Sequence, residues 1–177
     1  GALANRSLEL TLPEGLEGDY RLIVVADSGS VVPEPGAGGN NLVIGEPFGI
    51  ALAPYADLTV TSVTAPTRIV GDPATLTVSW TVRNDGTGIG DTTEWTDAVV
   101  LSRDQVLGNG DDIAIGTLRH FGGVPVGMTY EASAILDLPE RLEGTFTVFV
   151  TTDANGEVYQ FQNAANDSGS SPELLEV

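Results

Sequence analysis

The sequence contains no cysteine, no lysine, one histidine and one methionine in 177 residues. The absence of cysteine excludes disulfides and thiolate metal sites, and the single His120 excludes any site built from two imidazoles. Seven arginines stand against 25 acidic residues, so the formal net charge is −18. A surface this acidic repels phosphate groups, which argues against nucleic acid and against direct membrane contact. No apolar run approaches the ~20 residues that span a bilayer.

A segment near the N-terminus recurs near the C-terminus at an offset of 126 residues. Residues 12–20 read Leu-Pro-Glu-Gly-Leu-Glu-Gly-Asp-Tyr, and residues 138–146 read Leu-Pro-Glu-Arg-Leu-Glu-Gly-Thr-Phe. The match runs without a gap from the pair Ser7/Ser133 to the pair Asn40/Asn166. A long internal repeat is the signature of tandem structural units. We therefore expect residues 1–53 to be the C-terminal part of a preceding β-sandwich repeat, and residues 54–177 to be a complete repeat.

Alternating apolar and polar residues predict short β-strands throughout the chain. The clearest case is residues 76–83, where Leu76, Val78, Trp80 and Val82 alternate with polar residues. We expect further strands at 19–26, 58–64, 95–102, 113–119, 130–138 and 145–151, and a closing strand near 173–177. The turn residues Asn84-Asp85-Gly86 and Gly108-Asn109-Gly110 tolerate positive φ. With 22 glycines, 10 prolines and no helical periodicity, the sequence predicts an all-β, immunoglobulin-like antiparallel β-sandwich in tandem repeat, with almost no helix.

The order of short motifs in residues 54–177 resembles that of a known family. The motifs are residues 57–60 (Asp-Leu-Thr-Val), 82–88 (Val-Arg-Asn-Asp-Gly-Thr-Gly), 95–104 (Trp-Thr-Asp-Ala-Val-Val-Leu-Ser-Arg-Asp) and the Leu138-Pro139 turn. This pattern resembles the cell-adhesion-related domain found in bacteria (CARDB), an immunoglobulin-like sandwich repeated in large secreted and surface proteins. The chain departs from the family near its end, where Asn166-Asp167 replaces an Asn-Asn pair.

The acidic loop 104–112 is the best candidate for a metal site. It offers Asp104, Asn109, Asp111 and Asp112 as oxygen ligands within nine residues, with two glycines that let the chain bend. Calcium takes six to eight such ligands in flexible geometry. The alternative is a solvated hairpin loop whose side chains bond local backbone donors. With cysteine absent, calcium is the only staple that the sequence suggests for the sandwich.

Other polar and aromatic residues have simpler interpretations. Residues 153–157 place oxygens at alternate positions, but Asn155-Gly156 is equally a type I′ turn signal, which we favour. Asn163, Asn166 and Asp167, with Asn40 and Asn41 in the first copy, are expected to stabilise loops by bonding their own backbone. Trp80 and Trp95 are expected in the core, and Tyr55 is the better candidate for an exposed aromatic. His120 has no Gly-x-Ser-x-Gly nucleophile motif to serve, so no enzyme activity is expected.

These observations predict a non-enzymatic, extracellular or cell-surface repeat module that acts as an adhesive stalk or structural spacer. Its expected partners are adjacent repeats of the same chain and a surface glycan or protein. Two alternatives remain open. The incomplete first repeat could be completed by strands of a neighbouring chain, as in a filament or assembly. The chain could also be an accessory binding module of a secreted hydrolase.

Overall fold

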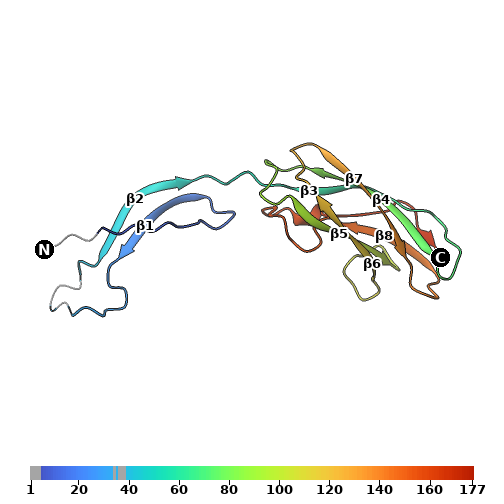
Figure 1. Ribbon diagram of the computed structural model, residues 1–177, viewed down its shortest axis with the longest axis horizontal. Helices are drawn as coiled ribbons and strands as arrows, with labels where there is room; N and C mark the ends of the chain where they lie inside the picture. Colours follow the sequence, from blue (N-terminus) through green and yellow to red (C-terminus); the bar gives the residue numbers. More distant parts are fainter. Residues whose placement is uncertain (1–4, 34, 36–38) are drawn as a thin grey trace. The chain divides into compact units, whose positions relative to one another are not determined.

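The computed structural model describes residues 5–33, 35 and 39–177 and divides the chain into two compact units (Figure 1). Unit 1 is Gly1–Ala53 and unit 2 is Pro54–Val177. Unit 1 is a two-stranded antiparallel sheet of β1 (Gly18–Val25) and β2 (Leu42–Ile50), with an irregularity in register between Arg21 and Ile23. All eight residues of β1 are exposed.

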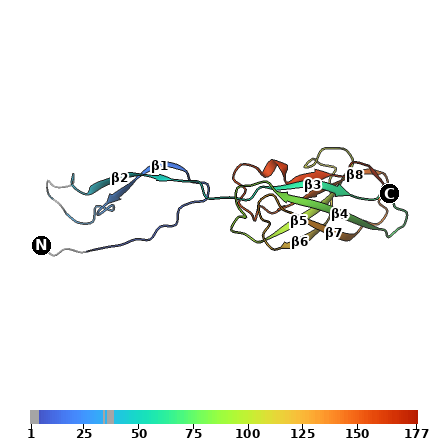
Figure 2. The ribbon, with the colours of Figure 1, turned by 90° about the horizontal axis from the view of Figure 1, so that it is seen from above.

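Unit 2 contains two antiparallel sheets, which face each other in Figure 1 and overlap in the view from above in Figure 2. One sheet has the order β3-β4-β7, formed by Leu58–Thr64, Thr75–Asn84 and Thr129–Asp137. The other has the order β10-β8-β5-β6, formed by Leu175–Glu176, Thr145–Thr151, Glu94–Ser102 and Ile113–Phe121. A short strand, β9 (Ser168–Ser170), also pairs with β8. This arrangement confirms the expected all-β, antiparallel fold and is consistent with an immunoglobulin-like sandwich.

The core of unit 2 lies between these sheets, where apolar side chains from both meet. In β4 the residues Leu76, Val78, Trp80 and Val82 are all buried, as their alternation predicts. The facing sheet contributes Trp95, Val99 and Leu101 from β5 and Phe146, Val148 and Val150 from β8. Both tryptophans are therefore core residues, as expected.

The structure bears on the predictions made for helices and for turns. Within the described residues the helical structure is one 3₁₀ turn, η1 (Ala164–Asn166), and no helix there is long and apolar enough to cross a membrane. Gly108 has a positive φ of 94°, as its turn motif predicts. The chain turns at Gly86 after β4, as predicted, although Gly86 does not have a positive φ. Gly86 instead lies so close to the backbone of Tyr55 that a Cβ atom would overlap the Tyr55 carbonyl oxygen.

Candidate functional site

The predicted calcium loop joins β5 to β6 and folds as a hydrogen-bonded hairpin loop. The Asp104 carboxylate accepts a hydrogen bond from the Val106 backbone N–H at 2.7 Å and another from the Asn109 side-chain amide at 3.0 Å. These donors, chiefly the Val106 N–H, hold the pKa of Asp104 below its usual value. Asp104 thus serves the local backbone, as the alternative interpretation of the loop describes.

Asp111 and Asp112 bond the same loop. Asp111 Oδ2 accepts from the Arg103 backbone N–H at 2.9 Å, and Asp112 Oδ2 accepts from that of Gly108 at 2.5 Å. The structure brings the four predicted ligands into one loop. Across the described ranges, however, no three acidic or imidazole side chains form a group that could hold a metal ion. Calcium at this loop stays a prediction.

The weaker metal candidate, residues 153–157, forms a turn. The Asp153 carbonyl accepts from the Gly156 N–H at 2.9 Å, and its carboxylate accepts from the N–H groups of Glu157 and Val158 at 2.7 and 3.1 Å. The segment is therefore a turn, as favoured, but not of type I′, because that type needs positive φ at both Asn155 and Gly156 and only Gly156 has it. The Asp153 side chain is nevertheless buried, because it belongs to a larger polar network.

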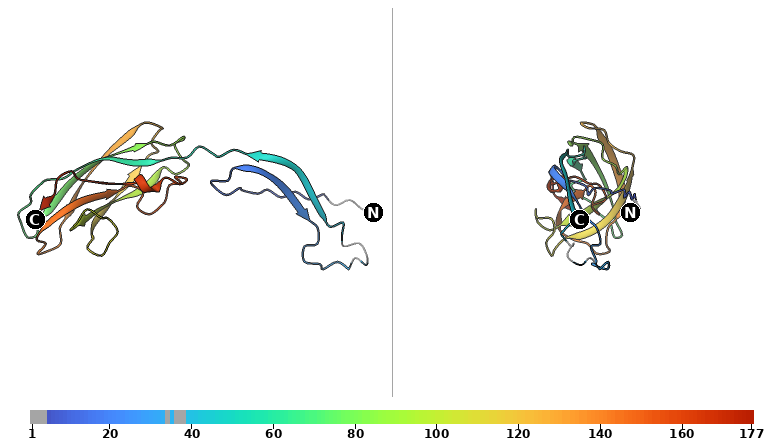
Figure 3. Two further views of the ribbon diagram at one scale, coloured as in Figure 1. Left: turned by 180° about the vertical axis from the view of Figure 1, so that it is seen from behind. Right: turned by 90° about the vertical axis from the view of Figure 1, so that its left-hand side faces the viewer.

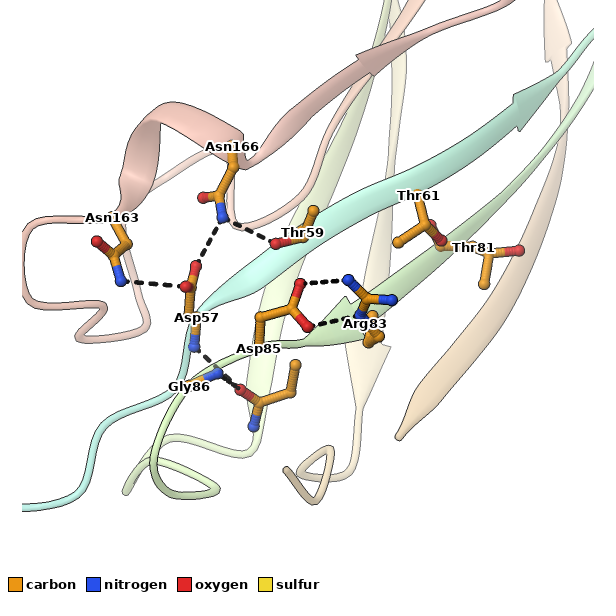
Figure 4. Close-up of polar contacts among 10 residues, drawn as sticks. Asp57, Thr59, Thr61, Thr81, Arg83, Asp85, Gly86, Asn163 and Asn166 are labelled. Carbon is orange, nitrogen blue, oxygen red and sulfur yellow. Dashed lines mark hydrogen bonds and ion pairs between the residues drawn. The ribbon is translucent and has the colours of Figure 1, made fainter. Parts of the chain in front are cut away.

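This network lies where the chain enters unit 2 and begins β3 (Figure 4). We call it the connector network. Its side chains come from the start of β3, the end of β4 and the turn after it, and the segment between β8 and β9: Asp57, Asn84, Asp153, Gln160, Asn163, Asn166 and Asp167. Segments about 30 and 100 residues apart in the sequence thus meet at one end of the sandwich.

Asn84 is the hub of the connector network and is fully buried. Its Oδ1 accepts from the backbone N–H groups of Asp57 and Gly86 at 3.0 and 2.9 Å. Its Nδ2 donates to the carbonyls of Gly88 and Val124 at 2.9 and 2.7 Å. The four bonds use both donors and both acceptor positions of the amide. Aspartate has the same shape but would lack the two donors.

The backbone of the turn after β4 also forms hydrogen bonds with the backbone of the connector. The Tyr55 carbonyl accepts from the N–H groups of Thr87 and Gly88, both at 2.9 Å, and the Asp57 carbonyl accepts from the Asp85 N–H at 2.7 Å. A Cβ on Gly86 would overlap the Tyr55 carbonyl oxygen. Glycine at position 86 is therefore required by close approach.

Side chains near η1 hold Asp57 and Leu58 from the other side. The Asp57 carboxylate accepts from the side-chain amides of Asn163 and Asn166 at 3.0 and 2.8 Å (Figure 4). Gln160 Oε1 accepts from the Leu58 N–H at 2.6 Å. The expectation that Asn163 and Asn166 bond their own backbone is wrong, because both amides reach across more than 100 residues of sequence to the start of β3.

The interior of the network is acidic, because the carboxylates of Asp153 and Asp167 both face Gln160. Gln160 Nε2 donates to the carboxylates of Asp167 and Asp153 at 2.9 and 3.3 Å. Asp167 Oδ1 is buried without a hydrogen-bond partner. Burial, together with the nearby charges of Asp153 and Asp57, raises the pKa of Asp167 to about 7 against the Gln160 hydrogen bond. Burial also raises the pKa of Asp153.

An exposed ion pair borders the network. The Arg83 guanidinium donates two hydrogen bonds to the Asp85 carboxylate, at 2.5 and 2.9 Å (Figure 4). This contact lowers the pKa of Asp85. Because both side chains face solvent, the pair contributes little to stability.

Another buried carboxylate, Asp97, lies in the core outside the connector network and links the two sheets. It accepts hydrogen bonds from the Trp80 indole at 2.8 Å, the Tyr130 hydroxyl at 2.7 Å and the Thr152 hydroxyl at 2.9 Å. Trp80 and Tyr130 belong to β4 and β7, whereas Asp97 lies on β5 and Thr152 follows β8. Burial, then the Asp97 charge, raises the pKa of Tyr130 well above its usual value.

His120 and Tyr55 each pack against other aromatic rings. The His120 ring stacks on Trp95 and lies against Tyr130, at centroid distances of 4.1 and 3.9 Å, and its Nε2 lies 2.7 Å from the Gly122 carbonyl. Tyr55 is half-buried and packs on Phe161 at 5.3 Å. Tyr55 is therefore less open to a ligand than the sequence suggested.

Comparison with known proteins gives structural neighbours only. No family model and no curated protein matches the sequence. Among solved structures, the chain is similar to the CARDB domain of the PF1109 protein from Pyrococcus furiosus. In a crystal structure described as a complex with di-metal ions, that domain has 18% identity and a TM-score of 0.47, with 70% of this chain and 94% of that chain covered. Its solution structure has 18% identity and a TM-score of 0.45, covering 69% and 96%.

A second kind of neighbour is an enzyme. β-Glucosidase 3B from Thermotoga neapolitana, in complex with glucose, has 13% identity and a TM-score of 0.42; the match covers 71% of this chain and 17% of that one.

Sequence reasoning missed Asp97 and the role of Asn84. A signal for Asp97 was present, because it alternates in phase with Trp95, Val99 and Leu101 and therefore points inward. Asn84 carried the same signal, because it continues the buried alternation of β4. Its partners could not be predicted from that pattern, because they lie in the connector and in a loop 40 residues away.

Proposed function

We propose that this chain is a non-enzymatic, extracellular repeat module of a larger bacterial surface or secreted protein, acting as an adhesive stalk or structural spacer. The connector network carries the proposal. Hydrogen bonds from two separate segments fix the backbone at Tyr55, Asp57 and Leu58, where the chain enters the sandwich. A spacer needs the direction of its incoming chain to be set, whereas a freely tethered domain does not.

The connector sequence supports the same function. β2 ends at Ile50 and β3 begins at Leu58, so only residues 51–57 lie between them. They read Ala-Leu-Ala-Pro-Tyr-Ala-Asp, without the Gly/Ser run of a flexible linker. Successive repeats joined by so short a connector would form a semi-rigid string and not a set of freely tethered domains.

Strand pairing in the two units supports the tandem repeat. In unit 1, Ile23 pairs with Ile44 and Val25 pairs with Leu42. Adding 126 to each number gives the pairs Phe149/Ser170 and Thr151/Ser168, which are the pairs formed by β8 and β9 in unit 2. The same hairpin register at the same offset is what two copies of one repeat would have.

Small-angle scattering on three tandem copies of residues 54–177 tests the spacer. We expect an extended particle whose maximum dimension grows with each added copy. The Asn84→Ala chain should keep its folded units but give a broader distribution of dimensions. An unmutated chain that scatters as one compact globule would refute the spacer.

The exposed hairpin of unit 1 favours a second candidate, completion by strands of a neighbouring chain. Tyr20, Leu22 and Val24 are 36%, 52% and 55% exposed, whereas their counterparts at the 126-residue offset, Phe146, Val148 and Val150, are fully buried. A two-stranded sheet with open edges and an exposed apolar face readily accepts a strand of another chain. Mass measurement in solution decides this. Concentration-dependent dimers that Leu22→Asp abolishes would support it, and a strictly monomeric 177-residue chain would exclude it.

A further inference from the structure

The chain enters and leaves unit 2 at opposite ends of the sandwich. Pro54 precedes β3 at the end that holds the connector network, and Val177 lies at the far end (Figure 1). The view from behind in Figure 3 shows the same two ends of this unit. β3 runs between them, from Leu58, which pairs with Asn84, to Thr64, which pairs with Ser79. A force that stretches the chain therefore acts along β3.

At the far end, the segment that follows β3 meets the last strand in parallel orientation. Arg68 and Glu176 form a parallel β-bridge. The Ile69 N–H donates to the Glu176 carbonyl and the Glu176 N–H donates to the Thr67 carbonyl, both at 2.9 Å. We call Thr67, Arg68, Ile69 and Glu176 the parallel patch. Residues 67–69, which follow the first strand of unit 2, are thus hydrogen-bonded directly to its last strand, β10.

The other side of β10 is bonded as well. Glu176 pairs with Thr145 of β8 in antiparallel orientation, and Val177 exchanges two backbone hydrogen bonds with Gly144, at 3.0 and 3.1 Å. Leu175, the residue before Glu176, pairs with Phe146 and is fully buried in the core. The last strand is therefore held on two edges and by one apolar side chain, although only two of its residues are assigned as strand.

This topology determines how tension would act. Pulling at Pro54 draws residues 67–69 toward the connector end, while pulling at Val177 draws β10 the opposite way. Because the two segments run parallel, the force slides one along the other, and the bonds between them lie across that force. They must then fail together. An antiparallel pair pulled apart from its common end instead opens one bond at a time.

We propose that unit 2 bears tension along its chain, and that shearing of the parallel patch together with the β8–β10 pairing sets the barrier to its forced unfolding. This rests on the proposed spacer function, because a spacer between an anchor and a bound partner is stretched. Forced unfolding is governed by the unfolding rate and not by equilibrium stability. The patch should therefore have a stronger effect on force resistance than on denaturation.

Single-molecule pulling of the full 177-residue chain tests the proposal, and the absence of native cysteine allows handles at chosen sites. The shear geometry uses Ala53→Cys and a cysteine appended after Val177, which places only unit 2 between the handles. The peeling geometry uses Glu140→Cys and the same C-terminal handle, because Glu140 is exposed and lies a few residues before Gly144. We expect a clearly higher unfolding force in shear than in peeling.

Two substitutions at one residue isolate the patch. Ile69→Pro removes both the side chain and the N–H that donates to Glu176, whereas Ile69→Ala removes most of the side chain and keeps the donor. At constant force in shear, Ile69→Pro should unfold about fivefold faster than Ile69→Ala, the factor expected for one hydrogen bond. In peeling the two variants should behave alike.

Equal forces in the two geometries, or equal shear rates for the two variants, would overturn the proposal. Failure of the spacer is distinguishable from this outcome. A compact scattering particle would refute the spacer and leave the force anisotropy intact, whereas an extended particle without force anisotropy would refute only the tension-bearing role.

Discussion

Asp167→Asn tests whether the connector network contains a carboxyl group that is held against its preferred ionisation. Asp167 is 7% exposed, lies near Asp153 and Asp57, and has a pKa raised from 3.8 to about 7. Between these two pH values the folded chain binds more protons at this site than the unfolded chain does. The stability that the protonated group provides is therefore fully present below about pH 3.8 and is lost as the pH rises through about 7.

The difference between 3.8 and about 7 corresponds to about 4 kcal/mol, at about 1.36 kcal/mol for each pH unit. Neighbouring Asn166 is half-buried, so solvent screens part of this energy and we expect about 2 kcal/mol. Asparagine cannot ionise, and its side-chain oxygen can still accept the Gln160 hydrogen bond. Asp167→Asn should thus stabilise unit 2 by about 2 kcal/mol at pH 8 and change little at pH 4.

Urea denaturation from pH 4 to pH 8, followed by tryptophan fluorescence, measures this effect, because both tryptophans lie in the core of unit 2. Asp137→Asn is the matched control, since it removes one charge from an exposed position on β7. Parallel pH profiles for the unmutated and Asp167→Asn chains would refute the reasoning. So would an Asp167→Asn chain that is less stable at pH 8.

Three further predictions follow from the contacts. Asn84→Ala leaves two N–H groups and two carbonyls without partners, so it should lower the free energy of unfolding by about 3 kcal/mol. Hydrogen exchange at the Asp57 and Gly86 amides should become faster, and unchanged exchange would contradict the hub role. Asp97→Ala removes the acceptor of the Trp80 indole and leaves the Tyr130 and Thr152 hydroxyls, 3.0 Å apart, with only each other as acceptors. It should cost about 3 kcal/mol in urea denaturation, and a cost below that of an exposed Asp→Ala change would contradict this role. Calcium binding at loop 104–112 predicts that millimolar calcium raises the melting temperature and that Asp111→Ala abolishes this rise. No calcium-dependent shift in the unmutated chain would remove that site.

The sequence predicted most strands of unit 2 because their local pattern and their burial agree. Residues 58–64 and 145–151 have the predicted bounds, and the alternation in β4 identifies its buried face. β2 was not predicted, because Gly45 and Pro47 interrupt its apolar pattern and count against a strand. Pro47 is accommodated opposite Arg21, next to the irregularity in β1.

The candidate site was harder to predict, because its contacts join distant segments. The sequence drew attention to clustered acids in loop 104–112, where neighbours along the chain bond each other. In the connector network, Asp57 depends on Asn163 and Asn166, which are more than 100 residues away. Composition and periodicity describe a residue's neighbours in sequence, so they cannot reveal such pairs before the fold is known.

The core also changes how this cysteine-free sandwich is held together. The sequence suggested calcium as the only staple, yet Asp97 joins β5 to both strands of the facing sheet that carry Trp80 and Tyr130, and to Thr152 after β8. These three bonds require the two sheets to face each other in one register, which apolar packing alone specifies less strictly. Three neutral donors satisfy the carboxylate, so the link needs neither a metal ion nor one of the seven arginines. This intersheet link is built from the chain's own side chains, so its three hydrogen bonds are the same whether or not loop 104–112 binds calcium.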